Sequence, residues 1–180
     1  MNYAVLLYFD RETEHSIFNL HDAVFKNEDV SALDKPRLRP HISLAGFSNI
    51  DQDRLVSLVQ DYANDIEPFD VRLSAIGTFP TEDNVLYLSP IPTIQLLTYH
   101  EKFHQRLARA KLESSPYYAP ARWIPHCTVE MNMSDEQFSE AMEICKNIFS
   151  PITGQFQEIG VVEYLPVRQL AAWPLIKKTV

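Results

Sequence analysis

This chain of 180 residues contains only two cysteines, Cys127 and Cys145. Two thiols are too few for a disulfide framework or a zinc ribbon. No apolar stretch is long enough to cross a bilayer. The apolar run near the start ends at Asp10 and has no basic flank, which is unlike a signal peptide. These absences predict a cytoplasmic protein in a reducing compartment, with no membrane association.

Basic residues are also scarce, with 16 lysines and arginines against 24 aspartates and glutamates, so the formal charge is −8. Binding to duplex or long nucleic acid requires many phosphate contacts, and a chain this acidic is a poor general binder of either. A locally favourable pocket can still hold one small anion. We therefore expect a small ligand rather than tightly bound long nucleic acid. The sequence leaves the oligomeric state open, and a monomer is our expectation.

Apolar residues make up 46% of the chain and charged residues 22%, which is the globular range. The length suits one domain of two lobes. Hydrophobic periodicity predicts strands and helices in alternation. The predicted strands are 3–9, 69–79, 85–88, 156–164 and 169–173, and the predicted helices are 11–26, 51–66, 93–112 and 134–149. A polar loop is expected over 27–38 and a turn over 165–167. Ser134 and Gln137 predict a capping box at the start of the last helix.

The chain is organised around a five-residue pattern that occurs twice. Pro40-His41-Ile42-Ser43-Leu44 and Pro125-His126-Cys127-Thr128-Val129 share a proline, a histidine, a hydroxyl residue and a final aliphatic residue. The residue types and the preceding proline favour extended backbone, so both segments are predicted strands. Residues i and i+2 of a strand point to the same face, so each histidine is expected beside its hydroxyl residue.

The two histidines lie 85 positions apart, and each predicted half has one such strand. This spacing indicates an internal repeat of about 85–90 residues. We predict an α+β fold over residues 1–180. It would be a single domain with two lobes related by a pseudo-two-fold axis. Antiparallel sheets would line a central cleft, and the helices would lie outside.

Two histidines across a cleft can act as general base and general acid, since imidazole titrates near neutral pH. The hydroxyl groups of Ser43 and Thr128 can donate hydrogen bonds to phosphoryl oxygens as negative charge develops there. These groups suffice for in-line displacement at a phosphodiester without a metal or other cofactor. A 2′,3′-cyclic phosphate is the natural substrate. We therefore predict His41 and His126 as catalytic residues, without assigning which is the acid.

The paired motifs resemble the signatures of the 2H phosphoesterase superfamily, which includes 2′-5′ RNA ligase-like proteins and cyclic nucleotide phosphodiesterases. The stretch Ile76-Gly77-Thr78-Phe79-Pro80 is similar to the segment that these proteins have between the motifs. The resemblance implies a hydrolase of RNA metabolism that acts on 2′-5′ linkages or 2′,3′-cyclic phosphates without metal; ligase activity stays open. Many relatives have a basic residue shortly after the second motif, where this chain has Glu130, which favours a nucleotide or short RNA end as substrate.

Several side chains near the motifs are candidates for substrate contacts. Trp123, Tyr118 and Phe47 can stack on a base, although core packing is the better interpretation for Phe47. Arg39 can face the phosphate or pair with one of the many carboxylates.

A second motif competes with the first. His100-Glu101-Lys102-Phe103-His104 matches the H-E-x-x-H pattern of zinc hydrolases. Glu130 or Glu136 could be a third ligand, but Lys102 places a cation inside the motif. The alternative is an amphipathic helix whose inner face contains both histidines. A further alternative to an enzyme is a nucleotide-binding protein of the same fold without catalysis.

Overall fold

The computed structural model describes residues 2–25, 38–164 and 166–178. Strands and helices alternate along these residues. The elements are β1 (Tyr3–Phe9), α1 (Arg11–Val24), β2 (His41–Phe47), α2 (Gln52–Ala63), β3 (Phe69–Gly77), β4 (Leu86–Pro90), α3 (Ile94–Arg109), the 3-10 helix η2 (Pro116–Tyr118), β5 (Cys127–Glu130), α4 (Asp135–Ile148), β6 (Ile152–Glu163) and β7 (Arg168–Pro174).

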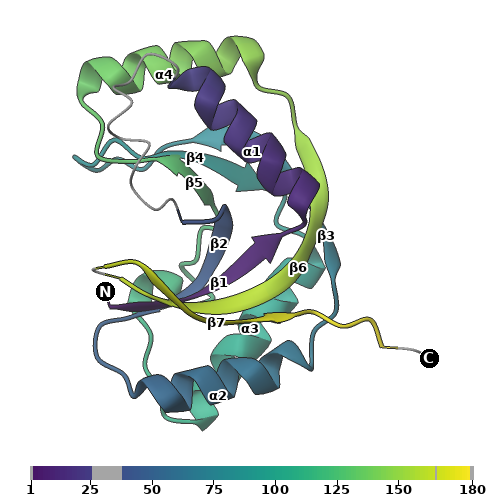
Figure 1. Ribbon diagram of the computed structural model, residues 1–180. Coiled ribbons are helices and arrows are strands. Elements are labelled where there is room, and N and C mark those ends of the chain that lie inside the picture. Colours follow the sequence, from purple (N-terminus) through teal and green to yellow (C-terminus); the bar gives the residue numbers. More distant parts are fainter. Residues whose placement is uncertain (1, 26–37, 165, 179–180) are drawn as a thin grey trace.

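The strands form one antiparallel sheet in the order β2-β1-β6-β3-β4-β5, with β7 paired to β6. The long strand β6 belongs to both lobes, since its first residues pair with β3 and its later residues with β1 and β7. Figure 1 shows that the sheet curves strongly, so that its two ends approach each other. The predicted α+β class, with antiparallel strands and outer helices, is confirmed. The strands of both lobes are joined through β6 into a single sheet.

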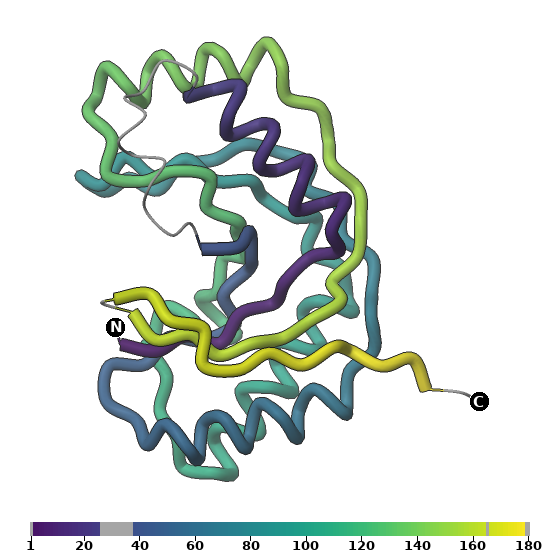
Figure 2. The backbone as a smooth tube through the Cα atoms, viewed as in Figure 1, coloured from purple at the N-terminus to yellow at the C-terminus, as the bar shows by residue number. Residues whose placement is uncertain are grey.

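Each lobe is covered by a pair of helices on its outer side, as the tube in Figure 2 makes clear. Helix α1 follows β1 along the chain but packs beside β5 and α4, on the opposite lobe. Helices α2 and α3 pack together on the lobe that contains β1, β2 and β7. Helix α1 therefore buries its apolar face on the lobe opposite to β1, the strand that precedes it in the chain. This arrangement connects the two lobes.

The hydrophobic core lies between the sheet and the helices. Alternate residues of β1 point to its two faces, and both faces are buried. Val5, Leu7 and Phe9 belong to the main core under the helices. Leu6 and Tyr8 belong to a second, smaller cluster on the inner face of the curved sheet. Strand β1 is therefore the fixed centre of its lobe, and the motif strand β2 pairs with it directly.

The predicted order of helices and strands is confirmed. The first or last residue of some elements differs from the prediction, because contacts between residues distant in sequence determine it. Strand β6 begins at Ile152 rather than near residue 156, because residues 152–156 pair with β3. Helix α1 ends at Val24, and the predicted loop 27–38 lies almost wholly outside the described residues, as does Leu165 of the predicted turn. The predicted capping box of Ser134 and Gln137 is present. The internal repeat and the single bilobal domain stay predictions.

Candidate active site

Strand β2 places His41 and Ser43 on one face and buries the residues that alternate with them. Ile42 and Leu44 are completely or almost completely buried, whereas His41 and Ser43 are half-buried. His41 pairs across the strands with Tyr8, and Ser43 with Leu6. Cross-strand partners share a face, so His41 and Ser43 lie on the inner face of the curved sheet, beside Tyr8.

The second motif is arranged in the same way. His126 directly precedes β5, and Thr128 pairs with Tyr87 of β4. Cys127 between them is completely buried in the core, and its thiol contacts the backbone of His41. Strands β2 and β5 are at opposite ends of the sheet order, yet they lie against each other because the sheet curves. His41 and His126 are close enough to interact electrostatically.

Both histidines are oriented by the same hydrogen bond. Nδ1 of His41 donates to the carbonyl oxygen of Arg39 at 2.7 Å, and Nδ1 of His126 donates to that of Ile124 at 2.7 Å. In each case the acceptor lies two residues upstream, just before the proline of the motif. Because a carbonyl can only accept, the proton of the neutral ring is on Nδ1. Nε2 of each imidazole is then the atom available for proton transfer.

Burial lowers the pKa of both imidazoles. The pKa of His41 falls to about 4, first because of burial and then because of the nearby His126, while the carbonyl of Arg39 opposes the shift. Burial also lowers the pKa of His126, against the opposing effect of the carbonyl of Ile124. Both rings are therefore neutral in the free protein at neutral pH. A bound phosphate would favour the charged form of either ring.

Tyr118, a candidate for stacking on a base, lies beside Ser43. Burial raises the pKa of the Tyr118 hydroxyl group, and the nearby Ser43 side chain opposes this shift. The short helix η2 that contains Tyr118 is attached to β2, because the backbone nitrogen of Ser115 donates to the carbonyl of Gly46 at 2.7 Å. Tyr118 is half-buried, so part of its side chain is accessible beside the first motif.

Arg39 is engaged by carboxylates. Its guanidinium group pairs with Glu14 at 2.7 Å and with Glu158. It also lies over the ring of Tyr8, 4.3 Å from the ring centroid. The two ion pairs fit the second interpretation made from the sequence, in which Arg39 pairs with carboxylates. In this arrangement its guanidinium group orders the backbone that precedes His41.

Trp123 is packed in the core and is only 9% exposed. One face of its indole is stacked on His100, with ring centroids 3.7 Å apart and an angle of 3° between the planes. Its Nε1 donates to the carbonyl of Ser43 at 3.0 Å. This geometry leaves little surface of the indole on which a nucleotide base could stack. Phe47 is 1% exposed, in agreement with the core interpretation.

The H-E-x-x-H motif lies on α3 with its two histidines turned toward β2. Nε2 of His100 and Nε2 of His104 both donate to the carbonyl oxygen of Leu44, at 3.2 and 3.0 Å. The glutamates considered as third ligands lie in other contacts, Glu130 with His21 and Glu136 with Ser134. Within the described residues no group of three or more His, Cys, Asp or Glu side chains could hold a metal ion.

Glu130, the acidic departure from the family pattern, is bound to α1. Nε2 of His21 lies 3.1 Å from its carboxylate, and the backbone nitrogen of Met131 donates to the same side chain at 3.0 Å. The Glu130 carboxylate is thus engaged in contacts within the fold and connects the end of β5 to α1.

An aromatic pair that the sequence analysis did not nominate packs against His126. Phe79 lies 4.9 Å from the imidazole and Tyr87 lies 5.4 Å from it, between ring centroids. Gly77 makes room for this pair, since a Cβ there would lie 2.5 Å from the Tyr87 ring. Phe79 belongs to the 76–80 stretch that carries part of the family resemblance, and this position in the sequence could have indicated a residue near the site.

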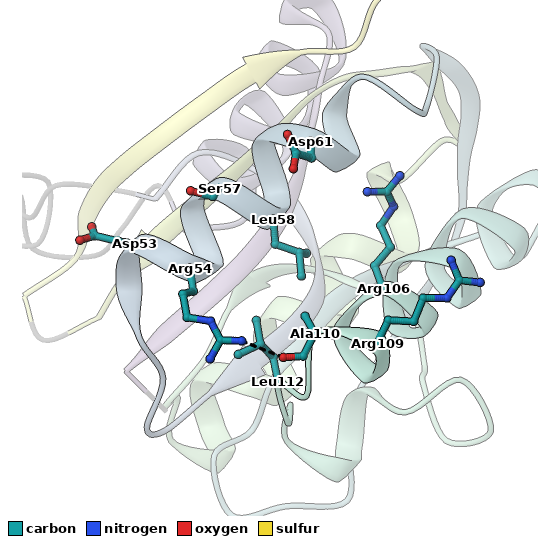
Figure 3. Close-up of a pocket in the computed structure, with 9 residues that line it drawn as sticks. All are labelled: Asp53, Arg54, Ser57, Leu58, Asp61, Arg106, Arg109, Ala110 and Leu112. Atoms are coloured by element: carbon teal, nitrogen blue, oxygen red, sulfur yellow. Dashed lines mark hydrogen bonds between the residues drawn. The ribbon is translucent and has the colours of Figure 1, made fainter.

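An open cavity of about 680 Å³ lies between α2 and α3. Figure 3 shows Arg54, Leu58 and Asp61 of α2 on one side of the cavity and Arg106 and Arg109 of α3 on the other, with the Arg54 guanidinium group directed at the carbonyl of Ala110. None of its lining residues belongs to either motif. We place the candidate active site at the paired histidines, because the groups that can transfer protons converge there.

Comparison with known proteins agrees with this geometry. The family model of the 2′-5′ RNA ligase superfamily matches residues 25–168. A provisionally named phosphoesterase of Bacillus licheniformis is 26% identical over 110 residues, which cover 59% of this chain. One of Bacillus pumilus is 27% identical over 110 residues. The matched segments span 61% and 60% of the lengths of these two relatives.

The fold is similar to that of solved structures over nearly the whole chain. LigT of Escherichia coli in complex with 3′-AMP superposes with a TM-score of 0.64 at 16% identity, covering 98% of both chains. The protein TT0787 of Thermus thermophilus superposes with a TM-score of 0.63 at 14% identity, covering 97% of this chain and 98% of the other. In the described part of the chain, every helix is too short or too polar to span a membrane. The twin motifs, the curved sheet that joins them and the match to the family model together show that this chain belongs to the 2′-5′ RNA ligase superfamily, the 2H phosphoesterases.

Proposed function

We propose that this protein is a metal-independent phosphoesterase that hydrolyses a 2′,3′-cyclic phosphate or a 2′-5′ phosphodiester of a nucleotide or short RNA end. One observation carries the proposal. Two imidazoles from the two motifs hold their Nδ1 protons on backbone carbonyls by the same hydrogen bond, which leaves both Nε2 atoms for proton transfer. Because each motif supplies one of the two groups, the whole of residues 1–180 acts as one functional unit.

In the proposed reaction one Nε2 takes a proton from the attacking water and the other gives a proton to the departing ribose oxygen. The water oxygen bonds to phosphorus and the bond from phosphorus to the ribose oxygen breaks. His41 suits the role of base, since its pKa is depressed to about 4 and its imidazole stays neutral into the acidic range. We therefore assign His41 as general base and His126 as general acid.

Ser43 and Thr128 supply the donors for the phosphate. Each lies two residues beyond a histidine on the same strand face, and each is half-buried. Neutral hydroxyl donors stabilise the charge that develops on the non-bridging oxygens. Phe79, beside His126, and Tyr118, beside Ser43, are the aromatic side chains best placed for a nucleotide base.

A small substrate fits the charge of the chain. The net charge of −8 disfavours the many phosphate contacts of long RNA. LigT of Escherichia coli has been solved in complex with 3′-AMP, NADP+ and ATP, which are ligands of the expected size. We propose the same size of substrate here, and a cytoplasmic role in RNA metabolism.

The test is a screen of 2′,3′-cyclic nucleotides and 2′-5′ dinucleotides in the presence of a chelator. Turnover in chelator is expected for the wild-type protein. His41→Ala and His126→Ala should each lose about 10²–10⁴-fold in kcat, and the double variant should lose little more, because the two groups act together. His15→Ala, an exposed histidine on α1, is the matched control with unchanged turnover. Tight nucleotide binding without turnover would instead favour a binding protein, and turnover that requires added Zn²⁺ would contradict the proposal.

A further inference from the structure

The H-E-x-x-H histidines and Trp123 converge on the backbone of the first motif. Among the strands of the described residues, β2 lies at the edge of the sheet and pairs with β1 alone. Carbonyl groups at such an edge need other donors when they are buried. Here the carbonyl of Leu44 accepts from His100 and His104, and the carbonyl of Ser43 accepts from Trp123. These contacts take the place of a neighbouring strand.

The spacing of the two histidines suits this contact. Residues i and i+4 share a helix face, and the rings of His100 and His104 lie 4.4 Å apart. A carbonyl oxygen has two lone pairs, so Leu44 can accept both N–H groups at once. His100 is 1% exposed, and its N–H donor is therefore shielded from competing water.

Trp123 links the two motifs directly. It lies three residues before His126 in the chain, and its indole donates to the backbone of Ser43, two residues beyond His41. Its ring is also stacked on His100. A single side chain therefore relates the segment of the second histidine to the strand of the first, and α3 holds that side chain in place.

We propose that His100, His104 and Trp123 are positioning residues that hold β2 in register with the segment before β5 and so set the separation of His41 and His126. We call these three side chains the β2 clamp. It rests on the proposed function, because the separation of the histidines matters for turnover only if both transfer protons. None of the three touches the substrate in this arrangement; they act through the backbone of Ser43 and Leu44.

The clamp is tested by removing donors while keeping side-chain volume. Trp123→Phe retains a ring to stack on His100 and loses the N–H to Ser43. His104→Leu removes one of the two donors to Leu44, at a position that is only half-buried. Since a misplacement of about 1 Å can cost about 10²-fold in rate, we expect kcat to fall roughly 10- to 100-fold in each, while KM changes less than about threefold.

Two further variants separate positioning from general loosening of α3. His104→Gln keeps a side-chain N–H donor and should restore most of kcat. Leu107→Val, a core substitution on the same helix, should lower stability by about as much as His104→Leu and leave kcat near that of the wild type. Any of three results would overturn the proposal. The first is a wild-type kcat in folded Trp123→Phe and His104→Leu. The others are a kcat of His104→Gln as low as that of His104→Leu, or an equal loss of kcat in Leu107→Val.

A readout without substrate separates failure of the clamp from failure of the proposed function. Absence of turnover in the wild type would count against the function alone. The imidazole ¹⁵N signals of His41 and His126 should still shift in Trp123→Phe and His104→Leu, because the two rings move relative to each other, and should stay in place in Leu107→Val. Unchanged signals in all three variants would overturn the clamp whatever the activity.

Discussion

The depressed pKa values of the paired histidines predict an acidic optimum for turnover. In the proposed mechanism the active form has a neutral His41 and a protonated His126. The pKa of His41 is about 4, and burial holds that of His126 below its ordinary value near 6.5. The productive form is therefore most populated between these two limits. We expect the bell-shaped profile of kcat/KM to be highest at acidic pH, below about 6.5, with limbs that belong to the coupled pair.

The alkaline limb gives the magnitude. With the acid's pKa below about 6.5, at most about one molecule in eleven has the protonated acid at pH 7.5, so kcat/KM should be at least about tenfold below its maximum. Bound phosphate favours the charged imidazole, so the profile of kcat should be displaced to higher pH than that of kcat/KM. A diester phosphate does not titrate in this range, which leaves the limbs to the protein.

The assay is initial-rate hydrolysis of a 2′,3′-cyclic nucleotide from pH 4 to 9 at constant ionic strength. Enzyme returned from each pH to pH 7 must recover full activity, which excludes acid unfolding as the cause of the acidic limb. A nucleotide ester with a good leaving group such as p-nitrophenolate needs no acid, so His126→Ala should recover rate on it and His41→Ala should not. An alkaline limb above pH 7.5 for kcat/KM, or rescue of His41→Ala alone, would refute the assignment.

Three other substitutions or conditions test the packing around the site. Burial lowers the pKa of His100 in the folded protein to about 3, so the neutral imidazole contributes its full stabilisation above about pH 6.5 and loses it as the pH falls. Between pH 7 and pH 5 the protein should lose about 2 kcal/mol of stability, or about 4–8 °C in Tm, and His100→Gln should lessen that loss. Gly77→Ala places a Cβ 2.5 Å from the ring of Tyr87; the displaced ring should lower kcat/KM about tenfold, and unchanged turnover in a folded variant would contradict this. Gly154→Ala places a Cβ 1.7 Å from Oγ1 of Thr13; a urea titration should show a loss of about 1–3 kcal/mol, and unchanged stability would show that α1 and β6 adjust freely.

The local features of the motifs could be predicted because they depend on neighbouring residues alone. The strand alternation that puts His41 beside Ser43 and buries Ile42 follows from residue types and period. The position of His126 relative to His41 was expected from the repetition of the pattern. The hydrogen bonds from Nδ1 to the carbonyls of Arg39 and Ile124 were not predicted. Residue types and periodicity do not determine the side-chain rotamer by which an imidazole reaches a carbonyl two residues upstream.

The curvature of the sheet was beyond local rules. Strands β2 and β5 are at opposite ends of the strand order, and they meet only because β6 continues through both lobes. Hydrophobic periodicity predicts strand β6 only from residue 156, which leaves out Thr153, Gly154 and Gln155. Pairing with β3 makes them strand residues. Gly154 allows the close approach of Thr13 and so lets α1 pack against β6.

The H-E-x-x-H motif illustrates why a helix pattern does not decide its own chemistry. Two imidazoles one turn apart can bind a metal through lone pairs or hold an oxygen through N–H groups, and the i, i+4 geometry is the same in both. The group that decides between the two roles lies on strand β2, outside the helix. It is the carbonyl oxygen of Leu44, 56 residues before His100, which both imidazole rings contact. That carbonyl is available because β2 lies at the edge of the sheet formed by the described strands. The contacts of His100 and His104 are therefore set by the position of β2 in the sheet, and in the proposed clamp the two motifs that compete in the sequence serve one site.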